Sequence, residues 1–195
     1  MNRNKYITFL LVIVFLFGST AFSQSKTNIE VYYSLVDSAA GLIAKRLPAE
    51  QNKIVVISNK NDYSIFTNRI KSTFNKLGVA PDSGVNTELT ISFDRTTVQY
   101  SDMHRESFFG SMWVKRKVEF GGNFSFNNKI APGEFLFSAI DSVKVDDIKK
   151  IENPVYPFTV SEVPPEPFFS SLLEPAAAIG TAAVAIYLFF SVRSK

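Results

Sequence analysis

The side chain in this sequence that could best serve as a catalytic base is the single histidine, His104. It lies in the polar stretch 101–106 (SDMHRE), where Asp102 or Glu106 could orient the ring. Nucleophilic catalysis also needs a nucleophile that the fold brings within hydrogen-bonding distance of the base. The stretch otherwise has the composition of a solvated loop. We therefore assign no catalytic residue.

The composition also argues against metal and cofactor sites. With one histidine and no cysteine, a transition-metal site would consist almost entirely of carboxylates, and the spacing of Asp141, Asp146 and Asp147 is not that of a calcium loop. No glycine-rich phosphate loop follows the apolar run 53–58, and there is no Gly-x-Ser-x-Gly motif. A pair of carboxylates for glycoside cleavage stays open, because such pairs leave no sequence signature.

The densest basic patch is Lys115-Arg116-Lys117, which stands beside Trp113. On a strand, Trp113, Lys115, Lys117 and Glu119 would share the solvent face, while Arg116 would fall among apolar residues, near an edge or with its charge reaching water. A basic and aromatic face could meet lipid head groups, glycan or a protein. An ordinary charged strand surface that resists edge pairing is the alternative.

The N-terminus has the order of a secretory signal. Arg3 and Lys5 precede an apolar run over 7–17, and small residues at positions 21 and 23 follow. The run is too short to cross a hydrocarbon core of about 30 Å. We therefore predict a signal peptide over residues 1–23, with an uncleaved anchor as the alternative.

The C-terminal stretch 176–192 carries no charge and is followed by Arg193 and Lys195. A helix from Pro175 to Val192 would be about 27 Å long, close to the thickness of a bilayer core. Basic residues remain on the cytoplasmic side of a membrane. We predict a transmembrane helix over 171–192 and a cytoplasmic tail over 193–195. Ala176 and Gly180 are candidate helix-contact residues because small side chains permit close approach.

These ends place the part between them outside the cytoplasm, anchored in a bacterial inner membrane and facing the periplasm. The whole chain has 21 basic and 18 acidic residues. Without Arg3 and Lys5 the balance is 19 to 18, and without Glu174, Arg193 and Lys195 as well it is 17 to 17. A neutral domain has no broad positive field, so we predict no binding to nucleic acid.

The exported domain is predicted over residues 24–152. Apolar residues at three- and four-residue steps predict helices over 33–47 and 65–77, on either side of a buried strand over 53–58. Alternating residues then predict strands over 89–100, 112–120, 124–126 and 134–143, with a turn preferred to a bulge at Gly121-Gly122. The sum is an α+β two-layer sandwich, with both helices on one face of a mixed sheet that ends in an antiparallel meander.

A proline-rich segment is predicted to run extended over residues 153–170, between the domain and the membrane. Tyr156, Phe158 and Val160 alternate in it, which indicates either packing along the domain or a plain spacer. Tyr156 and Phe158 therefore join Trp113, Lys115 and Lys117 as candidate partner-binding residues.

The functional prediction is a non-enzymatic accessory or assembly protein of the cell envelope that binds another envelope protein. The element order is similar to that of small periplasmic domains with such roles. Two alternatives remain. One is a membrane-anchored hydrolase with paired carboxylates, and the other is an envelope protein that binds a small ligand or lipid.

Overall fold

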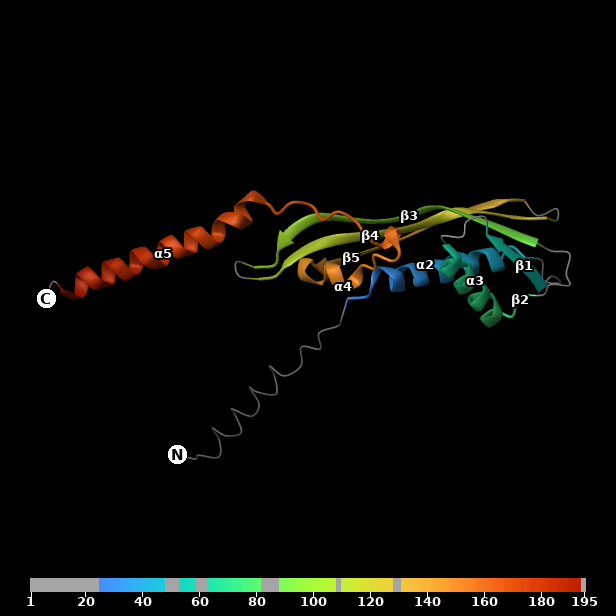
Figure 1. The fold of residues 1–195 in the computed structure, drawn as a ribbon, viewed down its shortest axis with the longest axis horizontal. Helices are drawn as coiled ribbons and strands as arrows, with labels where there is room; N and C mark the ends of the chain where they lie inside the picture. The colour runs from blue at the N-terminus through green and yellow to red at the C-terminus, as the bar shows by residue number, and fades with distance from the viewer. Residues whose placement is uncertain are drawn as a thin grey trace, which may run out of the picture.

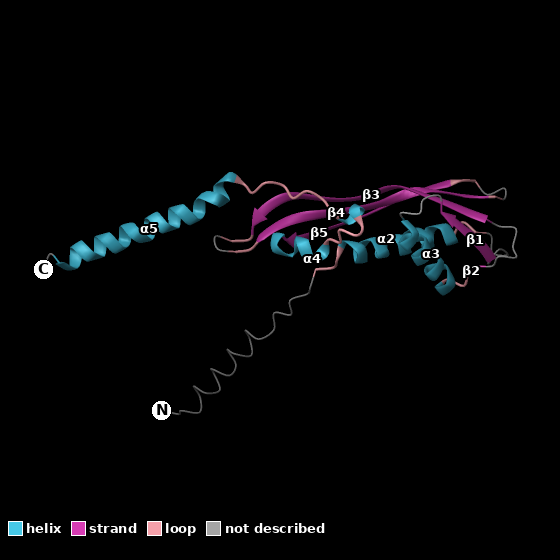
Figure 2. Cartoon of the chain, in the orientation of Figure 1, coloured by secondary structure: helices cyan, strands magenta, loops and turns pink. Residues whose placement is uncertain are grey.

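The computed structural model describes residues 25–47, 53–58, 63–81, 88–107, 110–127 and 131–193. A single sheet forms one layer and helices cover one of its faces, as Figure 2 shows. The predicted α+β class is confirmed. The predicted signal peptide over residues 1–23 lies outside the described residues.

The first described helix, α2 (Asn28–Ala44), begins at a capping box. The hydroxyl of Thr27 accepts the backbone N–H of Glu30, and the Glu30 carboxylate accepts the backbone N–H of Thr27 at 2.8 Å. Two otherwise unpaired donors are thereby satisfied. The helix therefore starts five residues before the predicted Tyr33, and it buries the side chains Val31, Tyr32, Leu35, Val36, Ala39, Ala40 and Ile43.

A strand–helix–strand unit follows. β1 (Lys53–Ser58) leads into α3 (Ser64–Lys76). Gly78, two residues beyond the end of this helix, has φ +79°, the left-handed conformation that glycine adopts at helix ends. β2 (Ala80–Pro81) then pairs with β1 in parallel. Helices α2 and α3 are joined by an ion pair of Asp37 with Arg69, whose Nη2 lies 2.6 Å from Oδ2. This guanidinium lowers the pKa of Asp37.

Three long strands form the meander: β3 (Glu88–Arg105), β4 (Met112–Phe126) and β5 (Gly133–Lys144). β1 pairs with β3 in parallel, and the sheet order is β2-β1-β3-β4-β5. The predicted mixed sheet and its antiparallel meander are therefore confirmed. Figure 1 shows the meander as a ribbon much longer than the helices beneath it.

Two predicted breaks in the meander are wrong. The polar stretch after Tyr100 continues β3, with a register shift between Ser101 and His104, where Asp102 has φ 51°. Gly121-Gly122 lies inside β4, opposite a bulge between Phe93 and Arg95 of β3. These glycines do not form a turn. Because they lack side chains, the backbones of β3 and β4 can approach closely at this bulge.

The core between the layers is rich in aromatic rings. Phe66 of α3 lies 5.1 Å from Phe120 of β4 and 5.5 Å from Tyr32 of α2, measured between ring centroids. Phe93 of β3 lies 5.3 Å from Phe120. Tilted and edge-on contacts of this kind add to the free energy of apolar burial.

After β5 the chain turns back over the helical side. The turn η2 (Val145–Asp147) and the short helix α4 (Ile148–Ile151) follow β5 directly. A segment that we call the strap, residues 153–163, then crosses the domain and includes η3 (Pro157–Thr159). Thr159 is fully buried, so the strap packs along the domain, which is the first of the two alternatives for this segment, and it is locally turned as well as extended.

The last helix, α5 (Phe168–Arg193), extends away from the sheet beyond one end of the domain (Figure 1). It begins before the predicted residue 171, and Pro175 lies inside it instead of in its first turn. In the described part of the chain, no helix combines the length and the apolar character that a membrane crossing requires. The predicted transmembrane helix over 171–192 is not supported.

The bulge gives a test of the register. A methyl group on Gly122 would lie 2.1 Å from the carbonyl oxygen of Ser92, whereas one on Gly41 of α2 would meet nothing within 4 Å. We expect Gly122→Ala to lower the free energy of unfolding by about 2 kcal/mol or more through overpacking. Gly41→Ala should leave it unchanged or raise it by up to about 1 kcal/mol. Denaturant unfolding followed by circular dichroism measures both, and equal stability of the two variants would contradict the register.

Candidate functional site

Among the described elements, no helix covers the face of the meander opposite α2 and α3 (Figure 2). Side chains of β3, β4 and β5 alternate, so that one set faces the helices and the other faces solvent. The solvent-facing set on β4 includes Trp113, Lys115, Lys117 and Glu119, which the sequence predicts to share a face. We call this surface the open face.

A groove of about 400 Å³ lies on the open face. Lys115 and Lys117 of β4 form its floor, and Ile140 of β5 lies beside Lys117 in the register of the two strands. Its other lining residues are Gln99, Tyr100, Ser101 and Ser161. Two cations, an exposed aliphatic side chain and hydroxyl and amide groups therefore meet in one hollow, which suits a surface that is partly apolar and partly anionic.

The lysines of the groove have neighbouring carboxylates. Lys117 Nζ lies 3.0 Å from Glu119 Oε1, and Lys115 Nζ lies 3.6 Å from Asp102 Oδ2. Exposed pairs of this kind contribute little to stability. Both lysines can therefore exchange these neighbours for a ligand or a partner at small energetic cost.

Trp113 lies at the far end of β4 from the bulge. Its ring faces Lys144 Nζ, which is 5.5 Å from the ring centroid, and its Nε1 donates to Glu106 Oε2 at 3.2 Å. The indole of Trp113 therefore contacts the last residue of β5 and the residue that follows β3. Trp113 shares the open face with the two lysines, but it does not line the groove.

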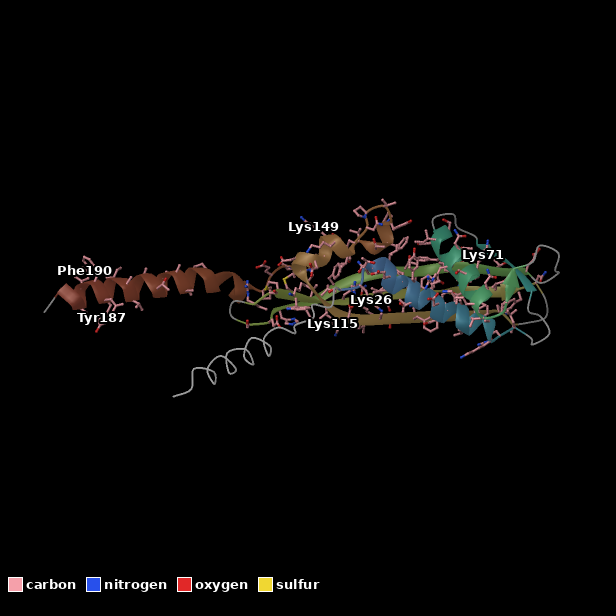
Figure 3. The ribbon with its side chains drawn as sticks, turned by 90° about the horizontal axis from the view of Figure 1, so that it is seen from below. Lys26, Lys71, Lys115, Lys149, Tyr187 and Phe190 are labelled. Carbon is pink, nitrogen blue, oxygen red and sulfur yellow. The ribbon has the colours of Figure 1, made fainter. Side chains whose placement is uncertain are left out.

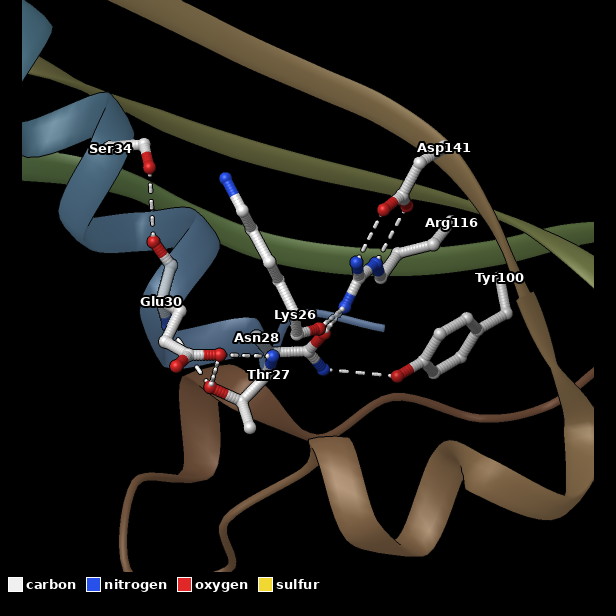
Figure 4. A network of polar contacts seen from close by, with 8 residues as sticks. All are labelled: Lys26, Thr27, Asn28, Glu30, Ser34, Tyr100, Arg116 and Asp141. Atoms are coloured by element: carbon white, nitrogen blue, oxygen red, sulfur yellow. Dashed lines mark hydrogen bonds and ion pairs between the residues drawn. The ribbon is translucent and has the colours of Figure 1, made fainter. Parts of the chain in front are cut away.

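Arg116 departs from the prediction of an edge position. It is fully buried on the helical face of β4, the middle strand of the meander, and its Nε and Nη2 donate to both carboxylate oxygens of Asp141, at 2.8 and 2.5 Å (Figure 4). Its Nη1 donates to the backbone oxygen of Lys26 at 2.7 Å and to Asn28 Oδ1 at 2.8 Å. A charge is tolerated here because a carboxylate and neutral acceptors surround it.

Asn28, which accepts a hydrogen bond from Arg116, also donates hydrogen bonds to the strap and to β3. Its Nδ2 donates to the backbone oxygen of Thr159 at 2.7 Å and to the hydroxyl of Tyr100 at 3.0 Å. Burial raises the pKa of Tyr100 to about 12. The strap is also held by Glu152, which accepts the N–H of Ser161 at 3.0 Å. Tyr100 and Ser161 both line the groove, so this network positions one of its walls.

The strap residues Tyr156 and Phe158 lie on the helical side. Phe158 packs on Tyr32, Tyr63 and Phe66, with ring centroids 5.0 to 5.7 Å apart, and its packing needs no partner protein. Tyr156 lies over Phe158 at 5.7 Å and is partly exposed. The structure therefore separates these two residues from Lys115 and Lys117.

The remaining predicted positions stand apart. Ala176 and Gly180 are exposed on α5. His104 is exposed near the end of β3, where its Nδ1 lies 3.0 Å from the backbone oxygen of Asp102. In the described part of the chain, no three potential metal-ligating side chains gather.

A second hollow of about 250 Å³ lies at the bulge, where Gly121 and Gly122 lack side chains. Asp94 and Glu134 both line it, and both are exposed to solvent. Asn123 donates to Asp94 Oδ2 at 3.1 Å.

The groove contains five lining residues that the sequence does not single out: Gln99, Tyr100, Ser101, Ile140 and Ser161. Gln99, Ser101 and Ile140 could have been found from strand alternation combined with the order of the strands, which pairs Gln99 with Lys117 and Lys117 with Ile140. Ser161 has no such signal, because the path of the strap sets its place.

The chain matches no protein-family model and no curated protein. Among solved structures it is similar to a minor lipoprotein from Acinetobacter baumannii, with 12% identity over 51% of this chain and 70% of that chain and a TM-score of 0.33. It is also similar to rare lipoprotein B from Shewanella oneidensis, with 8% identity over 68% of this chain and 98% of that chain and a TM-score of 0.32. At these values the likenesses carry no conclusion about a substrate or partner.

Proposed function

We propose that this chain is an extracytoplasmic accessory or assembly protein of the cell envelope, and that it binds another envelope protein through the open face of its sheet. The observation that carries the proposal is the groove over Lys115 and Lys117. Compartment and topology rest on the signal-like N-terminus and on the apolar C-terminal stretch of the sequence.

Several features support the open face as the contact surface. The helices cover the other face, so the sheet has one face to offer (Figure 2). Strands hold the groove floor rigidly, which lowers the entropy lost on binding. The groove combines Lys115 and Lys117 with the exposed aliphatic side chain of Ile140. A complementary partner would present carboxylates around an apolar side chain.

Attachment of α5 to an apolar environment is the second part of the proposal. Large apolar side chains of α5 are exposed, among them Ile179, Leu188, Phe189 and Phe190. Figure 3 shows Tyr187 and Phe190 projecting from α5 near its C-terminal end. The successive residues Leu188, Phe189 and Phe190 point about 100° apart around the helix axis, and all three are exposed. A helix that is apolar on all sides is buried in a protein or in lipid. The proposal requires only this attachment. A more specific form of it is a single crossing of the membrane with Arg193 and Lys195 in the cytoplasm.

Charge reversal tests the groove. We expect Lys115→Glu with Lys117→Glu to abolish co-purification of a bound envelope protein from the producing cell, because the groove floor would repel its acidic surface. The control variant, Lys149→Glu with Lys150→Glu, makes the same change in charge on α4, where both lysines are exposed.

Circular dichroism of both variants confirms that the fold is intact. Loss of the partner in both variants, or in neither, would contradict a contact through the groove.

The attachment of α5 has its own test. We expect the full chain to stay with membranes after a wash at high salt and alkaline pH, and Phe189→Glu with Phe190→Glu to release it, because charged side chains disfavour an apolar environment. Val155→Glu with Val160→Glu alters exposed apolar residues of the strap and should not release it.

Release of the unaltered chain would overturn the attachment. Labelling of Lys195 by a reagent confined outside the cell would contradict the predicted cytoplasmic C-terminus.

The two alternative functions have less support from the geometry. A hydrolase with paired carboxylates would draw on Asp94 and Glu134, which are exposed to solvent. A small anionic ligand or lipid could occupy the groove, which is the same surface. In that case, the charge-reversal variant would lose the ligand while the set of co-purified proteins stays the same.

A further inference from the structure

The two outer strands of the sheet differ sharply in length. At one edge lies β2, whose two residues, Ala80 and Pro81, form a short strand that includes a proline. At the other edge lies β5, which pairs with β4 over all of its twelve residues, from Gly133 to Lys144. Among the described strands, none pairs with the outer side of β5. A strand of this kind presents a row of unpaired backbone donors and acceptors.

Two of the usual features that protect an edge strand, a proline and a bulge, are missing from β5, and its three charged residues, Glu134, Asp141 and Lys144, lie toward its two ends. It contains no proline, and its pairing with β4 shows no register shift. The six residues from Phe135 to Ile140 carry no charge. Leu136 and Ile140 lie on the open face with exposed fractions of 53% and 58%. Long, regular, uncharged edges with exposed apolar side chains are sites of strand addition.

The pattern of β5 is self-complementary about Ser138. A two-fold axis at this residue would set Leu136 opposite Ile140 of a second copy, and the same contact would repeat on the other side of the axis. Glu134 would stand opposite Ser142 and diagonal to Lys144 of the second copy, so unlike charges would be neighbours. Of the antiparallel registers of two copies, the one centred on Ser138 is the one that brings the two exposed apolar residues together.

We propose that two copies of this chain associate through β5, antiparallel about a two-fold axis at Ser138, to form one continuous ten-stranded sheet. The backbone of each β5 supplies the hydrogen bonds, and the paired Leu136 and Ile140 side chains bury apolar area on the open face. This contact is isologous, so it closes at two copies. The inference does not depend on the proposed function, because it rests on the outer edge of β5 and not on the lysines of the groove, although Ile140 belongs to both surfaces.

The absence of cysteine from the sequence makes a direct test possible. In the proposed dimer the two Ser138 Cα atoms would be about 5 Å apart, within the range that a disulfide spans. The two Ser142 residues would be offset by eight positions, about 27 Å. Ser142 is exposed on the same face of the same strand, so it is a matched control.

We expect full-length Ser138→Cys in detergent to form a disulfide-linked species of twice the mass under mild oxidation, and Ser142→Cys to remain a monomer. In the Ser138→Cys background, Ile140→Lys should lower the yield several-fold, because two lysines would then face the Leu136 side chains. Thr97→Lys, at an exposed position of β3 on the same face, should leave the yield unchanged.

Equal linkage at both cysteine positions, or linkage at neither, would overturn the proposal. A photo-reactive residue placed at Leu136 in intact cell envelopes provides the second readout. An adduct that contains two copies of this chain supports the pairing, whereas an adduct with a different protein as the main product overturns it. The outcome is separate from the groove test, because reversal of Lys115 and Lys117 should not alter the linkage of Ser138→Cys.

Discussion

The buried guanidinium of Arg116 is the interaction on which the arrangement of this protein depends. It projects from β4 toward the helices and is 0% exposed, whereas its partner Asp141 on β5 is half exposed. Its remaining donor reaches the chain at the start of α2, through Lys26 and Asn28. Asn28 in turn bonds the strap. A charge in this place is costly unless all of these acceptors are present, so it selects the one arrangement that supplies them.

The same network links the two sides of the molecule. Phe158 and Thr159 bring the strap into contact with the helices, and Ser161 then carries it to the groove on the open face. The strap leads on to α5 through residues 164–167.

Local patterns predicted the class and the order of the elements but not the contacts between them. Alternation identified the strands of the meander, and helical periodicity identified α2 and α3, because each pattern follows from the burial of one face. The register of Gly122 opposite the bulge, and the burial of Arg116, depend on strands distant in sequence. A basic residue among apolar neighbours is usually read as an edge residue, and Asp141 gave no local sign that it would pair with Arg116.

Amide hydrogen exchange of the strap tests the role of Arg116 most directly. Loss of the guanidinium in Arg116→Met removes a donor from Asn28, a change worth about 1–3 kcal/mol. We predict about 10- to 100-fold faster exchange at the amide of Thr159, which is bonded to the Tyr156 oxygen. Lys117 is the next residue along β4 and lies on the open face. In Lys117→Met, the amide of Thr159 should exchange at the same rate as in the unaltered chain. Unchanged protection of Thr159 in Arg116→Met, or equal loss in both variants, would contradict this account.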